Sequence, residues 1–250
     1  MTKIKKVVVI GGTGLIGSKA VKLLQDAGHE AVVASSRNGI NAYTGEGLQA
    51  ALAGVDAVID VSNMMSFDKD VITDFFGTSS RNLTSAEQAA GVYNHVTLSI
   101  VNADQLASNP YMAGKLTQEE AVASSGQAYT IVRATQFHEF IETLTGAYAA
   151  DGAVKVPDID FQPIAATDVA AALVQAALGE PKNETIDLAG PERAPFGSFI
   201  RAYLDAKGDV RPVTADAAVD YFGAPVAKGS LVPGGEYIKG QITIAQWLKA

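Results

Sequence analysis

The chain has 250 residues, a formal net charge of −8 and no cysteine. The absence of cysteine excludes disulfides, thiolate nucleophiles and thiolate-bound metals, and the acidic charge, with scattered basic residues, argues against a nucleic-acid surface. No stretch approaches the roughly 20 apolar residues of a membrane span, and the apolar run near the N-terminus is too short for a signal peptide. We therefore expect a cytoplasmic protein without a membrane or nucleic-acid partner.

The first predicted elements surround a glycine-rich turn. Residues 7–10 form an apolar, β-branched run, and residues 15–27 follow with a helical spacing of apolar side chains, which indicates a strand, a turn and a helix. Gly12-x-Gly14-x-x-Gly17 allows a dinucleotide pyrophosphate to approach the N–H groups of a helix N-terminus closely. A flexible glycine-rich loop is the alternative. The residues expected to bind the dinucleotide are Gly11, Gly12, Thr13, Gly14, Leu15, Ile16 and Gly17.

Strands and helices alternate through the first 135 residues. Beyond the first pair, strands are predicted at residues 31–34, 57–61, 96–101 and 129–134, and helices at residues 45–52, 69–90 and 111–124. This alternation favours the α/β class, with a doubly wound parallel sheet (Rossmann fold) that binds its ligand at the carboxyl ends of the strands.

The pattern loosens after about residue 150. Short strands are expected at 154–156 and 162–164, a helix at 168–178 with Thr167 as its N-cap, and a strand at 185–188. We predict a single domain over residues 1–250. In it, residues 1–135 form the dinucleotide-binding core, and residues 136–250 complete that core and add a small C-terminal lobe that covers the substrate.

The end of the second strand indicates which dinucleotide binds. A NAD-binding unit places a carboxylate there, about 20 residues beyond the glycines, to hold the ribose hydroxyls. Here the positions hold Ser35, Ser36 and Arg37, whose hydroxyl and guanidinium groups suit a 2′-phosphate that a carboxylate would repel. We therefore expect NADP as the cofactor. A solvated loop cation is the alternative interpretation of Arg37.

A Tyr-x-x-x-Lys pair follows a predicted buried strand. Asn109-Pro110 is a favourable helix start, so Tyr111 and Lys115 are expected one turn apart on the same helix face. The preceding strand carries Ser99 toward the ligand edge of the sheet. The spacing alone arises easily by chance, and a surface tyrosine with a solvated lysine is the alternative.

With these residues in place, the chain resembles the short-chain dehydrogenase/reductase superfamily, and most closely its atypical NmrA-like branch of NAD(P)H-binding proteins. The resemblance covers most of the chain. That branch includes NADPH-dependent quinone and carbonyl reductases as well as NADP-binding redox sensors, and many members lack the active-site tyrosine. The segments that carry the branch resemblance are residues 11–17, 60–63, 133–137, 168–170 and 188–191.

The resemblance implies hydride transfer between a nicotinamide C4 and a carbonyl carbon. It assigns Tyr111 to protonate the developing alkoxide, Ser99 to hydrogen-bond the carbonyl oxygen, and Lys115 to hold the nicotinamide ribose and lower the pKa of the tyrosine. A cation about 5 Å from a phenolate, at an effective dielectric near ~20, is worth roughly 3 kcal/mol, or about two pKa units. Together with a helix N-terminus, this predicts a pKa of about 7 to 8 for Tyr111.

Further side chains are candidates for the cofactor and substrate sites. Asn63, at the end of its strand, is expected beside the nicotinamide, and Thr135, Phe137 and His138, just beyond another strand, are expected to line the substrate pocket. An alternative for His138 is a polar residue at a helix start. Its spacing to nearby carboxylates is not that of a zinc helix, so no metal is expected.

The leading functional hypothesis is an NADPH-dependent oxidoreductase of a small carbonyl or quinone substrate. A non-catalytic protein that senses NADP(H) is the second hypothesis, and an epimerase that retains its cofactor is the third. The sequence leaves open which small-molecule substrate is used. It also leaves open a homo-oligomer, because an interface helix looks like a core helix in a sequence.

Overall fold

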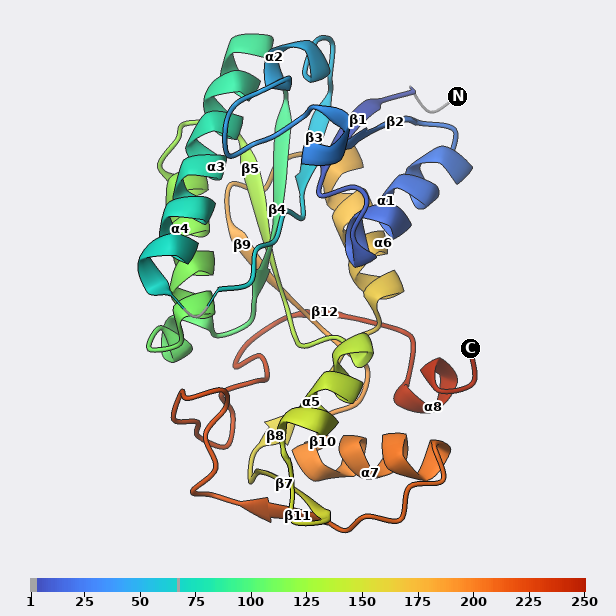
Figure 1. Cartoon of the computed structure of the whole chain (residues 1–250). Coiled ribbons are helices and arrows are strands. Elements are labelled where there is room, and N and C mark those ends of the chain that lie inside the picture. The colour runs from blue at the N-terminus through green and yellow to red at the C-terminus, as the bar shows by residue number, and fades with distance from the viewer. Residues whose placement is uncertain (1–3, 67) are drawn as a thin grey trace.

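β-Branched runs form the strands of a parallel sheet. In the computed structural model, which describes residues 4–66 and 68–250, seven strands pair in the order β12-β9-β5-β4-β3-β1-β2 (Figure 1). Every neighbouring pair in this sheet is parallel. The strands are β1 (Lys6–Ile10), β2 (Glu30–Ala34), β3 (Ala57–Asp60), β4 (Asn94–Ile100), β5 (Tyr129–Ala134), β9 (Thr185–Ala189) and β12 (Ile238–Lys239).

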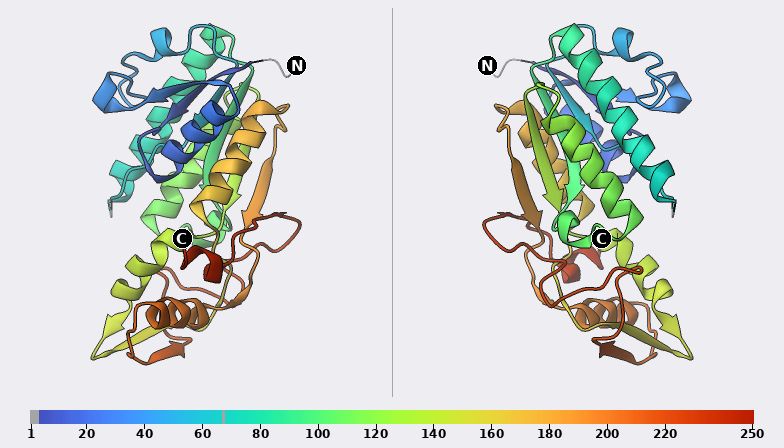
Figure 2. Two further views of the ribbon diagram at one scale, coloured as in Figure 1. Left: turned by 90° about the vertical axis from the view of Figure 1, so that its right-hand side faces the viewer. Right: turned by 90° about the vertical axis from the view of Figure 1, so that its left-hand side faces the viewer.

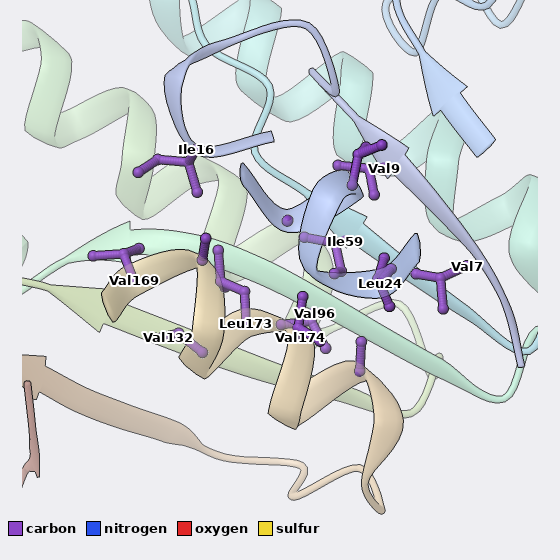
Figure 3. Close-up of a cluster of buried hydrophobic side chains, with 14 of the residues drawn as sticks. Val7, Val9, Ile16, Leu24, Ile59, Val96, Val132, Val169, Leu173 and Val174 are labelled. Carbon is purple, nitrogen blue, oxygen red and sulfur yellow. The ribbon is translucent and has the colours of Figure 1, made fainter. Parts of the chain in front are cut away.

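Helices cover both faces of the sheet (Figure 1 and Figure 2). α1 (Leu15–Asp26) and α6 (Ala166–Leu178) lie on one face, and α3 (Lys69–Ala90) and α4 (Pro110–Ala123) lie on the other. Between the sheet and α1 and α6, valine, leucine and isoleucine side chains form a buried core (Figure 3). Each such side chain stabilises the fold by about 1.5–3 kcal/mol relative to exposure. None of the described helices is long and apolar enough to cross a membrane.

The strand order reverses beside β1. β1 lies between β2 and β3, so the chain turns to one side for the second strand and to the other for the third. Connections that diverge in this way leave a crevice at the carboxyl ends of the strands, where ligands bind. The glycine-rich turn leaves β1 at this point. The predicted fold class, a doubly wound parallel sheet, is confirmed.

A smaller lobe lies beyond the carboxyl ends of β4 and β5 (Figure 1). Its core is aromatic, with the rings of Phe161 and Phe196 at a centroid distance of 4.4 Å. The chain leaves this lobe to add α6 and β9 to the sheet, and leaves it again to add β12. The lobe elements are α5 (Ile141–Ala147), β6 (Ala149–Ala150), β7 (Ala153–Pro157), β8 (Asp160–Phe161), β10 (Ala194–Pro195), α7 (Phe196–Ala206), β11 (Val213–Asp216) and α8 (Ile244–Trp247).

The segment between β2 and β3 is less helical than the sequence predicts. It contains the short 3-10 helix η1 (Ser36–Asn38) and a single turn, α2 (Leu48–Ala51), where a helix over residues 45–52 was expected. Gly45 and Gly47 have φ angles of 79° and 72°. These left-handed conformations are incompatible with an α-helix, so the helix begins only after them.

Two predictions near α6 are also wrong. Residues 162–164 do not form a strand. The strand lies just before them, in β8, which pairs with β10, and Ile164 makes only an isolated bridge. The N-cap of α6 is Ala165, not Thr167. The carboxylate of Glu139 takes over the capping function by accepting a hydrogen bond from the Ala166 amide at 3.1 Å.

Candidate active site

Backbone hydrogen bonds within the turn and to the end of β2 hold the glycine-rich turn that follows β1. The Gly11 amide donates to the Ala34 carbonyl at 3.0 Å, and the Gly14 amide donates to the Gly11 carbonyl at 2.9 Å. Gly11 has a φ of 77°, and a Cβ atom on it would lie 2.7 Å from the Val61 carbonyl oxygen. The turn therefore packs directly on the segment that follows β3, and only glycine fits there.

Four amide groups at the start of α1 have no acceptor. Within residues 4–66 and 68–250, nothing accepts a hydrogen bond from the amides of Thr13, Leu15, Ile16 or Gly17. A Cβ on the exposed Gly14 would meet only the Gly11 carbonyl oxygen, at 3.3 Å, so the space in front of the helix is open. Unpaired N–H groups at the positive end of a helix dipole fit a pyrophosphate. These residues therefore fit a dinucleotide.

The loop after β2 presents the residues expected to recognise a 2′-phosphate. The Asn38 side chain accepts a hydrogen bond from the Ser35 amide at 2.8 Å and donates to the Val33 carbonyl at 2.6 Å, which fixes η1. Ser36 and Arg37 are exposed. Arg37 forms no ion pair or hydrogen bond with any residue that the structure describes. An unpaired guanidinium at this position fits an anionic group.

Tyr111 lies in the first turn of α4. The side chain of Asn109 caps this helix and accepts a hydrogen bond from the Tyr111 amide at 2.9 Å. The Tyr111 hydroxyl donates to Oδ1 of Asn63 at 2.9 Å, and its ring packs edge-on against Phe76 of α3 at a centroid distance of 6.1 Å. Asn63 lies two residues beyond Val61, which contacts the glycine turn. The structure thus brings the turn, Asn63 and Tyr111 together.

The pKa of Tyr111 is higher than the sequence predicts. Burial raises it to about 12, where a value of about 7 to 8 was expected from a neighbouring cation. The expectation is wrong for this structure because the Lys115 ammonium is bound elsewhere, by Gln118. Tyr111 is consequently a protonated phenol at neutral pH, which is the form that a proton donor needs.

Lys115 is buried in a polar network between α4 and β3. Its ammonium donates to Oε1 of Gln118, and Nε2 of Gln118 donates to Oδ2 of Asp60 at 2.8 Å. The Lys115 nitrogen also lies 4.7 Å from the centroid of the Phe76 ring. Burial lowers the pKa of Lys115 to about 8, although the carboxylates of Asp60 and Glu119 favour the charged form.

The lowered pKa of Lys115 predicts a pH-dependent stability. The unfolded chain keeps the lysine proton up to its ordinary pKa of 10.5, whereas the folded chain keeps it only to about 8. The unfolded state therefore binds more protons between these values, and stability rises with pH in that window. Relative to Lys115→Met, we expect the free energy of unfolding of the parent to rise by about 2 kcal/mol between roughly pH 7 and 9.5. Chemical denaturation at both pH values measures it, and an equal pH dependence for both proteins would contradict it.

Ser99 lies in the second half of β4. Side chains alternate along a strand, so it faces the same side as His95, whose ring contacts Glu87 of α3 at 2.9 Å. This is the face that α4 covers with Tyr111 and Lys115. Ser99 is buried, and its hydroxyl has no hydrogen-bond partner among the described residues. Buried polar groups are normally paired, so this hydroxyl has a hydrogen-bonding capacity that the described residues do not use.

Thr135, Phe137 and His138 lie at the junction between the sheet and the smaller lobe. The buried Thr135 hydroxyl donates to the Gln162 carbonyl at 2.6 Å. His138 is also buried, with its ring 5.7 Å from Trp247, and burial lowers its pKa. Only Phe137 of the three keeps partial exposure. The structure therefore gives Thr135 and His138 contacts within the protein and leaves Phe137 as the one able to present surface to a ligand.

Gln118 is a functional candidate that the sequence interpretation missed. It lies on α4 one turn beyond Lys115, and it links the ammonium to Asp60. Its spacing of three residues from Lys115 is the spacing of neighbours on a helix face. That spacing was the available signal, but glutamine on a helix usually faces solvent.

A family model described as NAD(P)H-binding matches residues 11–180. The chain belongs to the NAD(P)H-binding family. The match begins at the glycine turn and includes Tyr111 and Lys115. It confirms the coarser part of the cofactor prediction, a nicotinamide dinucleotide. It also agrees with the resemblance to the NAD(P)H-binding, NmrA-like proteins that the sequence indicates.

Two named relatives and one solved structure are also similar to this chain. The NAD(P)H azoreductase of Xenophilus azovorans is 30% identical over 227 residues, which cover 83% of this chain and 75% of the relative. The photosystem II assembly factor Ycf39 of Synechocystis sp. is 32% identical over 173 residues, which cover 64% of this chain and 50% of the relative, so the chain spans about half the length of that protein. The NADPH-dependent quinone oxidoreductase QOR2 of Escherichia coli shares the fold, with a TM-score of 0.69, 18% identity, and coverage of 97% of this chain and 98% of that chain.

Proposed function

We propose that the protein is an NADPH-dependent oxidoreductase that reduces a small carbonyl or quinone substrate. The observation that supports this most is the continuous contact from the glycine turn through Val61 and Asn63 to Tyr111. This contact joins the glycine turn, where the cofactor phosphates are expected, to the protonated hydroxyl group of Tyr111. NADPH, when bound, supplies a hydride to the substrate carbon. Tyr111 donates a proton to the substrate oxygen, so a ketone becomes an alcohol, and a quinone gives a keto tautomer that enolises to the hydroquinone.

Lys115, Ser99 and Asn63 have supporting roles in this proposal. Lys115 is mostly protonated at neutral pH, because its pKa is about 8, and it provides the cation for the nicotinamide ribose. The unpaired hydroxyl of Ser99 binds the substrate oxygen. Asn63 lies beside the nicotinamide and holds the Tyr111 hydroxyl through its Oδ1. Phe137, which keeps partial exposure, lines the substrate site.

The names of two similar proteins agree with reduction by NAD(P)H. One is an NAD(P)H azoreductase and the other an NADPH-dependent quinone oxidoreductase. Azo and quinone groups both accept a hydride and a proton. This shared chemistry places quinones first among the substrates to test.

Arg37 is expected to select NADPH over NADH. In Arg37→Glu, the guanidinium that contacts a 2′-phosphate is replaced by a carboxylate that repels it. We expect the Kd for NADPH to rise by at least about tenfold while the Kd for NADH changes little. Titration calorimetry with both cofactors measures the two values. Equal NADPH affinities for the variant and the parent would show that Arg37 is only a solvated cation.

A screen of NADPH oxidation tests the proposed function directly. Purified protein is incubated with NADPH and one acceptor at a time from panels of quinones, ketones, aldehydes, imines and azo dyes, and the loss of NADPH absorbance is followed. At least one quinone or carbonyl acceptor is expected to give turnover that depends on the protein. If NADPH binds but no acceptor is reduced, the oxidoreductase proposal is wrong.

The similarity to Ycf39 favours one second candidate, an NADP(H)-binding protein that assists another protein. That relative is named as an assembly factor. In this case the Kd for a protein partner would depend on whether the dinucleotide is bound, and replacing Tyr111 would have no catalytic effect. Turnover in the acceptor screen distinguishes the two candidates.

A further inference from the structure

The chain makes a tight turn against the start of α4. Tyr221 and Ala224, the first and last residues of the turn, exchange two backbone hydrogen bonds of 2.9 and 3.0 Å. Phe222, inside the turn, has a φ of 48°, a left-handed conformation that is rare for an aromatic residue. Its carbonyl accepts a hydrogen bond from Nδ2 of Asn109 at 3.1 Å. Because Oδ1 of the same Asn109 accepts from the Tyr111 amide, one side chain positions both the turn and the proposed proton donor.

Four aromatic side chains form a shelf at this turn. The Phe222 ring lies 5.0 Å from Tyr221, 5.9 Å from Tyr148 and 6.1 Å from Phe140, measured between ring centroids. We call these four residues the aromatic shelf. Phe222 is still 39% exposed, so part of its ring is open after it has packed on the other three.

The shelf lies close to the candidate active site. The Asn109 side chain contacts the Phe222 carbonyl with one end and the Tyr111 amide with the other, so the turn that carries the shelf lies against the first turn of α4. Near Asn63, which accepts the hydrogen bond from the Tyr111 hydroxyl, the chain also carries Met65, two residues further on and 70% exposed.

We propose that the aromatic shelf is a wall of the substrate site and that Phe222 gives this site a preference for neutral, planar aromatic acceptors over small aliphatic ones. The proposal rests on the proposed function, because it names the substrate class of the same site. An aromatic ring held in place by three others offers a flat surface for offset stacking. The residue that precedes the turn is Asp220, whose carboxylate disfavours anionic acceptors. A strained backbone persists where the surrounding contacts enforce it, and such sites are commonly functional. Asn109 acts here as a positioning residue.

The first experiment compares two acceptors of different shape. Steady-state NADPH oxidation is measured with 1,4-naphthoquinone and with butane-2,3-dione for the parent, Phe222→Ala and Phe222→Tyr. We expect Phe222→Ala to raise the KM for the quinone at least about fivefold more than the KM for the dione, and Phe222→Tyr to keep the parent ratio. Tyr93→Ala is the control, because Tyr93 is similarly exposed but lies just before β4, at the amino ends of the strands and away from the candidate site. Equal changes for both acceptors would overturn the proposal.

Asn109→Asp tests the positioning role without removing the helix cap. Aspartate keeps the acceptor for the Tyr111 amide but cannot donate to the Phe222 carbonyl. We expect the lost hydrogen bond to lower the Tm by about 2–4 °C and the KM for 1,4-naphthoquinone to rise relative to that for the dione. If the ratio of the two KM values stays at the parent value, the hydrogen bond does not position the shelf.

A binding measurement separates this proposal from the proposed function. 1-Naphthol is planar and aromatic but is not reduced, so its Kd for the NADP⁺-bound protein is measured by titration calorimetry. We expect Phe222→Ala to weaken binding at least about fivefold and Tyr93→Ala to leave it unchanged. If no acceptor is reduced but 1-naphthol binding still depends on Phe222, the oxidoreductase proposal fails and the shelf remains a ligand site. If acceptors are reduced but neither measurement depends on Phe222, the shelf proposal fails alone.

Discussion

Tyr111→Phe is expected to lower kcat by about 10²–10⁴-fold, the usual contribution of a positioned general acid. The change removes only the hydroxyl, and the ring keeps its edge-on contact with Phe76. The lost hydrogen bond to Asn63 costs about 1 kcal/mol of stability, which a folded α/β domain tolerates. We therefore expect the fold and the Kd for NADPH to survive while turnover is lost. Steady-state kinetics with any acceptor that the parent reduces, together with calorimetry for NADPH, measures both quantities.

Tyr129→Phe is the matched control for this experiment. Tyr129 is also partly buried, but it begins β5 at the amino ends of the strands, away from Tyr111. The kcat of Tyr129→Phe is therefore expected to match the parent value. An undiminished kcat for Tyr111→Phe would mean that the proton comes from another donor or from water. A fall in NADPH affinity without a fall in kcat would mean that Tyr111 binds the cofactor and donates no proton.

The dinucleotide-binding half of the site was predictable because its chemistry is carried by neighbouring residues. A glycine turn needs its strand before it and its helix after it, and both are local patterns. The position of Ser35 and Arg37 after β2 likewise follows from counting along one strand and helix, and their role toward the cofactor stays a prediction. Tyr111 and Lys115 were placed correctly on one helix because Asn109 and Pro110 mark its start.

The other half depends on contacts between distant parts of the chain. The link from Gln118 to Asp60 spans 58 residues, and the link from Asn109 to Phe222 spans 113. No periodicity reports such pairs. The pKa of Tyr111 was missed for the same reason. The direction in which this pKa shifts depends on how far Tyr111 is buried and on where the Lys115 ammonium is held. Both are properties of the packed structure.

Gly14→Ala and Gly17→Ala are expected to separate cofactor binding from folding. Gly14 has φ −80° and ψ −179°, which alanine adopts readily, and its added Cβ would meet only the Gly11 carbonyl oxygen at 3.3 Å. Gly14→Ala is therefore expected to lower the Tm by only a few degrees, because the new contact is close but not a collision and alanine is a poorer N-cap than glycine. The new methyl group projects into the open space before α1, where the pyrophosphate is expected, so the Kd for NADPH should rise by at least about tenfold.

Gly17→Ala is expected to damage both the fold and the binding site. Its Cβ would collide with the Gly11 carbonyl oxygen and lie 2.7 Å from Cα of Gly12, so backbone has to move. Overpacking of this kind costs about 1–3 kcal/mol, which lowers the Tm by several degrees in a domain of this size. The turn that offers the four amides is also displaced, so NADPH binding is lost as well. Ser18→Ala, which alters an exposed side chain on the next residue, serves as the control for both variants. Thermal unfolding and NADPH calorimetry measure the two effects. If Gly14→Ala binds NADPH as the parent does, the start of α1 is not where the pyrophosphate lies.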